Sequence, residues 1–143
     1  MNTLLRLLPC ALLLTCFSIT EAQVIGKWKT FGEQDGKEKA IIEIYEQDGR
    51  LIGKVVKLLP DAAIRQCNNC QGSMKDKPIE GMVIMHSLTK TSQGATDGKI
   101  IDPSSGKTYS CFVELSKPDT LKVRGYIGMP TLGRTQYWQR VKA

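Results

Sequence analysis

Residues 40–58 read AIIEIYEQDGRLIGKVVKL, and this stretch decides which class of fold the rest of the chain can join. Two runs rich in isoleucine, valine and tyrosine, residues 40–46 and 51–58, are separated by Gln-Asp-Gly-Arg. An Asp-Gly pair between two β-prone runs supplies the positive φ angles that a tight hairpin turn requires. The stretch therefore predicts two antiparallel strands joined by a short turn.

The same alternation of short strands and turns extends over most of the chain. No segment shows a convincing helical period over ten or more residues. β-Prone runs bounded by turn residues predict further strands at 24–30, 81–88, 98–102, 107–115, 121–127 and 134–141. Strands in this number and at this spacing indicate either a sandwich or an up-and-down barrel. We expect an all-β fold, a small antiparallel barrel of about eight strands, because barrel closure removes exposed strand edges.

One long segment, residues 59–80, interrupts the series of strands. Its turn-forming residues are Pro60, Asn68, Asn69, Gly72 and Pro78. Loops of this length in compact domains are usually functional or are held down by other contacts. We therefore expect one long loop over residues 59–80.

The beginning of the chain has the pattern of an export signal. Arg6 precedes an apolar run at residues 7–14, and Thr20 and Ala22 are the small residues expected before a cleavage site. The apolar run is shorter than the roughly 20 residues that a membrane-spanning helix needs. We therefore expect residues 1–22 to be a signal peptide.

Cleavage before Gln23 leaves residues 23–143, which we expect to form one barrel domain. An exported protein of this kind would reside in the periplasm, on the cell surface or outside the cell. A less favoured alternative is a lipoprotein acylated at Cys16, because Thr15 is an unusual residue directly before such a cysteine. No membrane-spanning segment is expected.

The formal net charge of +6 does not indicate a nucleic-acid-binding protein. The lysine and arginine residues are scattered along the chain and form no dense run. Binding to nucleic acid typically needs a basic stripe with interleaved aromatic residues. The sequence therefore predicts a positively charged surface without a nucleic-acid partner.

Several motifs in a fixed order resemble those of one bacterial family. They are Gly26-Lys27-Trp28-Lys29-Thr30, Tyr45-x-x-Asp48-Gly49-x-Leu51-x-Gly53-Lys54, Cys67-x-x-Cys70-x-Gly72, Lys77-Pro78-Ile79-x-Gly81, Ile101-Asp102-Pro103-x-x-Gly106-Lys107-x-Tyr109-x-Cys111, Val123-Arg124-Gly125-Tyr126-Ile127-Gly128 and Leu132-Gly133-Arg134-Thr135-Gln136-x-Trp138-x-Arg140. On these motifs the chain resembles the bacterial exported family named domain of unknown function 2147. The resemblance covers essentially all of residues 23–143, and it implies a lipocalin-like β-barrel.

Trp28 and Arg140 are similar to a pair in lipocalins, where a tryptophan at the barrel floor is covered by an arginine from the last strand. A guanidinium group over an indole face gains about 0.5–2 kcal/mol. The resemblance therefore implies that Trp28 and Arg140 form a structural plug and do not contact a ligand.

Three cysteines follow the predicted signal peptide, and an oxidising compartment favours a disulfide between two of them. We favour Cys67–Cys70, because proximity makes this bond easy to form, with Cys111 buried as a small apolar residue. A link from Cys70 to Cys111 stays open, because closing the longer loop would stabilise more. Redox catalysis is less favoured because no helix supports the Cys-x-x-Cys pair. Zinc binding by Cys67, Cys70, Cys111 and His86 is less favoured too, because only half of the ligand spacing is present.

No catalytic constellation is evident in the sequence. His86, the single histidine, has no nucleophile on a recognisable sharp turn to activate. The carboxylates at 43, 80, 102 and 114 belong to different predicted elements, so nothing sets their separation. We expect a protein without catalytic residues, metal or cofactor.

The last two predicted strands carry the densest cluster of polar and aromatic side chains. Its members are Arg124, Tyr126, Arg134, Gln136 and Trp138. A few polar groups among aromatic residues inside a barrel are typical of a ligand site. We therefore expect a small apolar or amphiphilic ligand in the barrel mouth, contacted by Arg124, Tyr126, Arg134 and Trp138. The alternative is an envelope protein-interaction module that uses the 59–80 loop.

Overall fold

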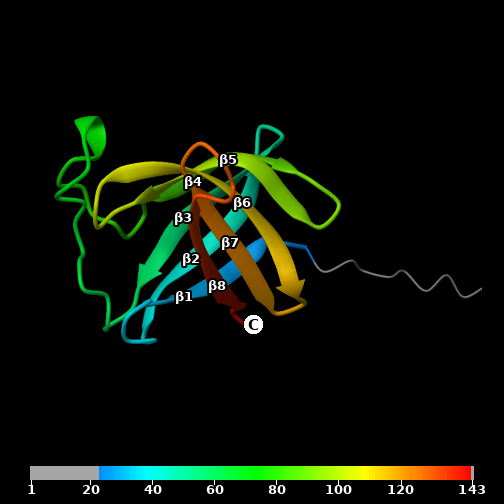
Figure 1. Ribbon diagram of the computed structural model, residues 1–143. Coiled ribbons are helices and arrows are strands. Elements are labelled where there is room, and N and C mark those ends of the chain that lie inside the picture. The colour runs from blue at the N-terminus through cyan, green and yellow to red at the C-terminus, as the bar shows by residue number, and fades with distance from the viewer. Residues whose placement is uncertain (1–22, 143) are drawn as a thin grey trace, which may run out of the picture.

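The computed structural model describes residues 23–142 as a closed antiparallel barrel of eight strands (Figure 1). The predicted signal peptide, residues 1–22, lies outside the described residues. In chain order the elements are β1 (Gly26–Phe31), β2 (Glu38–Gln47), β3 (Arg50–Leu58), the short 3₁₀ helix η1 (Gly72–Met74), β4 (Val83–Lys90), β5 (Gly94–Asp102), β6 (Lys107–Lys117), β7 (Thr120–Tyr126) and β8 (Gly133–Arg140). The prediction of an all-β antiparallel barrel of about eight strands is confirmed.

Each strand pairs with the next one along the chain, so the local turns set most of the topology. The first predicted hairpin is confirmed as β2 and β3, in which Gln47 pairs with Arg50. Asp48 and Gly49 have φ angles of 51° and 77°, the left-handed conformation that this two-residue turn needs. Within residues 23–142, no helix is long and apolar enough to cross a membrane.

Among the strands that extend beyond their predicted runs, β5 differs most at its start. β5 begins at Gly94, whereas the β-prone run begins only at Gly98. The additional residues pair with β6, where Ala95 lies opposite Val113 and is almost fully buried. A side chain at Gly94 would collide with the Val113 carbonyl group, so the absence of a side chain permits this close pairing.

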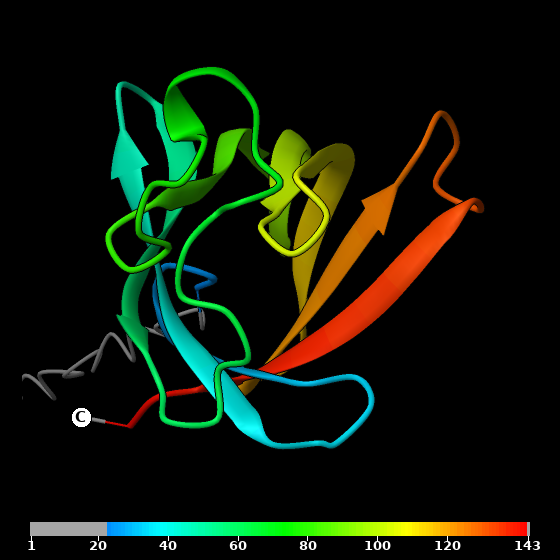
Figure 2. The ribbon, with the colours of Figure 1, turned by 90° about the vertical axis from the view of Figure 1, so that its left-hand side faces the viewer.

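The two ends of the barrel differ in how their interior is filled. At the end with the short turns, the side chains of Trp28, Ile44, Leu51, Leu88 and Leu121 are completely buried. At the other end lie the connections 32–37, 59–82, 103–106 and 127–132. Figure 2 shows the tip of the β7–β8 hairpin standing apart from the long β3–β4 connection at this end. We call these the closed end and the open end of the barrel.

The closed end is also where the first and last strands meet. Only two residue pairs join β1 to β8, Trp28 with Arg140 and Lys29 with Gln139. The Arg140 guanidinium carbon lies 4.3 Å from the centroid of the Trp28 ring. Because few backbone pairs hold this seam, we expect the side-chain contact between Arg140 and Trp28 to contribute to its stability.

Both side chains of this pair are also hydrogen-bonded to the backbone. Arg140 donates from Nη2 to the Gln23 carbonyl at 2.7 Å and from Nε to the Pro118 carbonyl at 3.2 Å. The Trp28 indole N–H donates to the Val24 carbonyl at 2.8 Å. Arg140 therefore ties together the segment before β1 and the turn before β7, and it covers the buried indole.

Replacement of Arg140 by alanine is expected to lower the free energy of unfolding by about 2–3 kcal/mol, through loss of the contact with Trp28 and of charged hydrogen bonds. Chemical denaturation followed by tryptophan fluorescence measures this change. Arg134→Ala on the same strand is the matched control. Its ion pair with Glu33 is exposed, so its loss should cost less than about 1 kcal/mol. Equal losses in the two variants would contradict a special role for Arg140.

Candidate functional site

A cavity of about 500 Å³ occupies the open half of the barrel. Most of its wall is apolar and comes from several strands, including side chains of Ile42, Val55, Ile84, Ile100, Val123 and Trp138. Ile79, from the long β3–β4 connection, contributes to the same wall. The cavity is thus enclosed by the sheet on most sides and by one loop on another.

The cavity exists because small residues stand at inward-facing positions of the open half. Gly125 on β7 lines the cavity, and a Cβ atom built on it would meet only Ile100 and Tyr109, each at 3.8 Å. On the same strand, Leu121 faces inward at the closed end and is completely buried. Ala40 on β2 also lines the cavity, and its short side chain leaves space there. The choice of glycine and alanine at these positions leaves the open half hollow.

One wall of the cavity carries a chain of hydrogen bonds between polar side chains. Glu33, in the β1–β2 connection, accepts hydrogen bonds from Arg134 and Gln136 of β8, both at 3.0 Å. The Gln136 carbonyl oxygen in turn accepts a hydrogen bond of 3.1 Å from the Trp138 indole. The series runs from an exposed arginine at the rim to a buried tryptophan. Further polar residues of the lining, Thr30, Lys39, Asp102 and Tyr109, belong to other strands.

The polar–aromatic cluster predicted from the last two strands is divided by the structure. Arg134, Gln136 and Trp138 line the cavity, whereas Arg124 and Tyr126 do not. Along β7 alternate residues face opposite sides of the sheet, and Val123 and Gly125 take the inward positions. Arg124 and Tyr126 therefore belong to the outer face and form no part of the candidate site.

The outward residues of β7 have partners of their own. Arg124 donates from Nε and Nη2 to the Pro130 carbonyl, at 3.0 and 2.8 Å, and from Nη1 to the Thr135 hydroxyl at 3.0 Å. The ring centroids of Tyr126 and Phe112 lie 6.4 Å apart. Arg124 thus fastens the β7–β8 turn to its own hairpin.

Glu33 lines the cavity, although it is not among the candidate site residues predicted from the sequence. It lies in a turn-rich connection outside any predicted strand, and 101 residues separate it from Arg134. No local pattern signals a contact of this range. Only closure of the barrel brings the β1–β2 connection beside β8.

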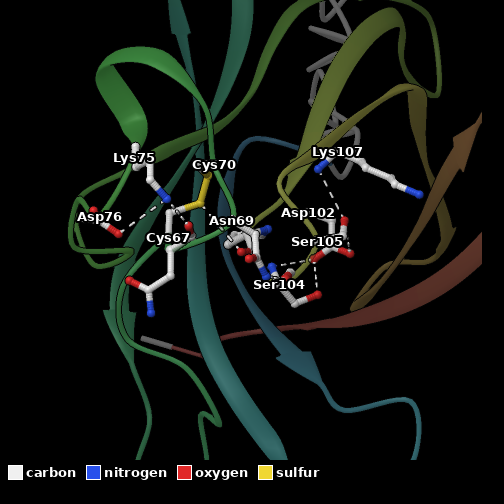
Figure 3. The surroundings of a disulfide bond; sticks show 11 residues. Cys67, Asn69, Cys70, Lys75, Asp76, Asp102, Ser104, Ser105 and Lys107 are labelled. Carbon is white, nitrogen blue, oxygen red and sulfur yellow. Dashed lines mark hydrogen bonds and ion pairs between the residues drawn. A yellow bond between two sulfur atoms is a disulfide. The ribbon is translucent and has the colours of Figure 1, made fainter.

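The predicted disulfide between Cys67 and Cys70 is present, and it organises the long loop beside the cavity (Figure 3). Asn69, between the two cysteines, donates a 2.6 Å hydrogen bond to the Ser104 carbonyl in the β5–β6 turn. A side chain at Gly106, where φ is 73°, would collide with the Asn69 carbonyl oxygen. The loop therefore packs directly on this turn.

The β5–β6 turn that receives the loop is itself held by Asp102. Its carboxylate accepts hydrogen bonds from the backbone N–H and hydroxyl of Ser104, at 2.9 and 2.6 Å, and from the Ser105 hydroxyl at 3.0 Å (Figure 3). Partial burial alone would raise the pKa of Asp102, but these hydrogen bonds outweigh burial and lower it below its ordinary value. Asp102 is therefore an ionised structural acceptor at the cavity wall.

The cysteines of the disulfide and the single histidine differ in their exposure to solvent. Cys67 and Cys70 are 0% and 2% exposed, so an external thiol cannot reach their disulfide without movement of the loop. His86 is exposed on β4, with Nδ1 2.9 Å from the Ser87 hydroxyl. In residues 23–142 no group of three or more histidine, cysteine or acidic side chains could hold a metal ion.

Cys111 is a free thiol in the protein interior. Burial raises its pKa to about 12, and the nearby Lys99 opposes this shift only weakly. A thiol with such a pKa stays protonated near neutral pH and is a poor nucleophile. The structure thus gives Cys111 a packing role.

Replacement of both Cys67 and Cys70 by alanine is expected to lower the free energy of unfolding by about 2 kcal/mol, since the unfolded chain loses a short covalent loop. Chemical denaturation with and without dithiothreitol measures this change. Reductant should bring the wild-type protein down to the stability of the variant and leave the variant unchanged. An identical stability for wild type and variant without reductant would show that the bond constrains nothing.

Cys111 is expected to resist iodoacetamide at neutral pH in the folded protein and to react after denaturation. Mass spectrometry of the peptide that contains Cys111 reports the labelling.

The raised pKa of Cys111 also makes the free energy of unfolding depend on pH in alkali. The contribution of the Cys111 thiol to the free energy of unfolding is complete below its ordinary pKa of 9.0. It is lost as pH rises towards the folded-state pKa of about 12, because the thiol of the unfolded chain ionises first. Cys111→Ala should therefore lose less stability than wild type over this range.

Two comparisons with known proteins place the chain by fold and by sequence. Among solved structures, the barrel is similar to protein HP1028 from the human pathogen Helicobacter pylori, which is described as belonging to the lipocalin family. The TM-score is 0.74 at 18% sequence identity, and the match covers 85% of this chain and 84% of the other. At this identity the likeness establishes a lipocalin-like fold alone. No curated protein matches the chain.

The sequence itself matches a family model over residues 26–140, from the first residue of β1 to the last residue of β8. The family is described as "Uncharacterized protein conserved in bacteria (DUF2147)". The match spans the whole barrel, including the cavity wall and the disulfide loop, and it agrees with the motifs that first indicated the resemblance. The chain therefore belongs to the bacterial DUF2147 family.

Proposed function

We propose that this protein is an exported, non-enzymatic binding protein that holds a small, partly apolar ligand in the open half of its barrel. The observation that carries the proposal is the apolar cavity of about 500 Å³. Ligand pockets in proteins typically measure about 300–1,000 Å³ and combine apolar walls with a few polar groups. This cavity has both features.

The distribution of polar groups supports one orientation of the ligand. Its apolar part would lie deep in the cavity, against Ile42, Val55 and Val123, and its polar part at the wall that Glu33, Arg134 and Gln136 form. Arg134 is 77% exposed, so its guanidinium can turn from Glu33 to a ligand at little cost. An amphiphilic molecule therefore fits this cavity better than a fully apolar one.

Two features support an exported location. The first 22 residues have the pattern of a signal peptide, and the Cys67–Cys70 disulfide needs an oxidising compartment to persist. We propose the periplasm or the cell surface as the place of function.

Substitution of Gly125 by leucine tests the proposed site directly. The backbone there suits any residue, and the side chain would extend into the cavity from a position with space for its Cβ atom. With N-phenyl-1-naphthylamine as the fluorescent probe, Gly125→Leu should weaken binding roughly tenfold or more, since the leucine occupies the ligand volume. Tyr137→Leu, on the outer face of β8, is the matched control and should bind as the wild type does.

The thermal midpoint of each variant distinguishes a filled cavity from a disrupted fold. Gly125→Leu should keep the midpoint of the wild type or raise it, because a glycine in a strand packs poorly. Binding of the probe with equal affinity by wild type and Gly125→Leu would show that the probe sits elsewhere and would remove the basis of the proposal. Native mass spectrometry of the exported protein then identifies any ligand that copurifies.

A further inference from the structure

The connection between β7 and β8, residues 127–132, exposes more apolar surface than any other turn among residues 23–142. We call these residues the apolar tip. Ile127, Met129 and Leu132 are 65%, 60% and 64% exposed, and they are three of the six large apolar side chains exposed in the described part of the chain. Clustered exposed apolar side chains usually mark a contact surface, unlike single ones scattered over a protein.

The apolar tip is held in a defined conformation by hydrogen bonds. Ile127 donates its N–H to the Leu132 carbonyl at 3.0 Å, and Leu132 donates to the Met129 carbonyl at 2.9 Å. The Arg124 guanidinium holds the Pro130 carbonyl with two further bonds. The apolar side chains are thus kept in solvent by an ordered turn, so their exposure does not result from a loose loop.

Positive charge lies next to the apolar tip. Arg124 reaches into the turn from β7, and Arg134, 77% exposed, follows the turn on β8. The acidic group beside them, Glu33, is already paired with Arg134. The chain as a whole has a net charge of +6. With Glu33 counted, the two arginines leave a net charge of +1 beside the three apolar side chains, so the tip is an amphipathic projection with a weakly positive base.

We infer that the apolar tip docks on an anionic lipid bilayer. Ile127, Met129 and Leu132 would enter the interface between headgroups and acyl chains, and the exposed Arg134 would face the lipid phosphates. Interfacial binding grows with buried apolar area and with attraction to anionic lipids, and this projection offers both. The tip is a single convex turn, whereas a stable protein interface needs about 800 Å² of fitted surface on each partner. A fluid bilayer accommodates such a convex shape without a matching pocket, whereas a protein partner would need a pocket fitted to it.

Docking in this way would also place the cavity against the membrane. Ile127 and Leu132 line the cavity as well as the apolar tip, so the mouth would open at the lipid interface. An amphiphile could then pass between bilayer and barrel without crossing water. This consequence rests on the proposed ligand binding, whereas docking itself depends on the tip alone.

Flotation with lipid vesicles tests the inference. The exported protein should float with vesicles of phosphatidylcholine and phosphatidylglycerol and much less with pure phosphatidylcholine, and added salt should weaken the binding. Met129→Glu should reduce binding to the anionic vesicles roughly tenfold or more, because a carboxylate enters the interface poorly and is repelled by the lipid. Tyr137→Glu, at a similarly exposed position on the wall of the barrel, should bind as wild type does.

Met129 does not line the cavity, so the two proposals can fail separately. Met129→Glu should retain wild-type affinity for N-phenyl-1-naphthylamine in the absence of vesicles, which also shows that the variant is folded. If Gly125→Leu still binds vesicles, the docking inference stands, even where the probe measurements contradict ligand binding in the cavity. Equal vesicle binding by wild type and Met129→Glu would overturn docking through the tip.

Tryptophan fluorescence at position 129 is a second test of docking through the apolar tip. Trp28 and Trp138 are buried, so the emission of Met129→Trp should report the environment of the tip and shift to the blue on anionic vesicles. An unshifted emission with vesicles present would overturn the inference. So would sedimentation showing that the wild type associates with itself and binds no vesicles, while Met129→Glu stays monomeric. That result would assign the apolar tip to a second copy of the chain.

Discussion

The contact between Arg140 and Trp28 is the interaction on which the barrel depends. Seven of the eight strand pairings join neighbours in sequence, and six of these seven are connected by only two to six residues. The eighth joins β1 to β8 through only two residue pairs and has no turn to guide it. Here the guanidinium group covers the indole ring and reaches three backbone carbonyls. The seam that converts a meander into a barrel is therefore held by these side-chain contacts together with a short stretch of backbone pairing.

The interior of the closed barrel is filled at one end and hollow at the other. Around Trp28 the interior is filled by large aliphatic residues, and the structure there resembles an ordinary core. Beyond it, Ala40 and Gly125 leave space that the neighbouring side chains do not fill. A rigid, packed half can support a hollow half, because the sheet is continuous around the barrel. The packed end of the barrel therefore supports the strands that enclose the cavity.

The loops at the open end carry the features that relate to function. The disulfide loop rests on the β5–β6 turn and closes one side of the cavity. The β1–β2 connection supplies Glu33 to the polar wall, and the β7–β8 connection presents apolar residues to solvent. Each loop is tied to its surroundings by hydrogen bonds, so the open end is shaped before any ligand arrives. Binding to a preorganised site avoids the entropic cost of ordering it.

The sequence by itself determined most of the strands, the turn at Asp48 and Gly49 and the likeness to one bacterial family, and it favoured the pairing of Cys67 with Cys70. These properties depend on residues that are close along the chain, where alternation of side chains and turn chemistry act directly. The same alternation also separates Arg124 and Tyr126 from Val123 and Gly125. The predicted cluster grouped residues by type across both faces, and it therefore included two residues of the outer face.

Only the tertiary structure decided which half of the barrel is hollow, that Glu33 joins the polar wall, and that Ile127 and Leu132 serve both the cavity and the exposed tip. Each of these facts depends on contacts between residues far apart in the chain, such as the 101 positions between Glu33 and Arg134. Such contacts are set by the closure of the sheet and by the volume that all inward side chains leave together. No local pattern encodes that volume, because it is a sum over eight strands.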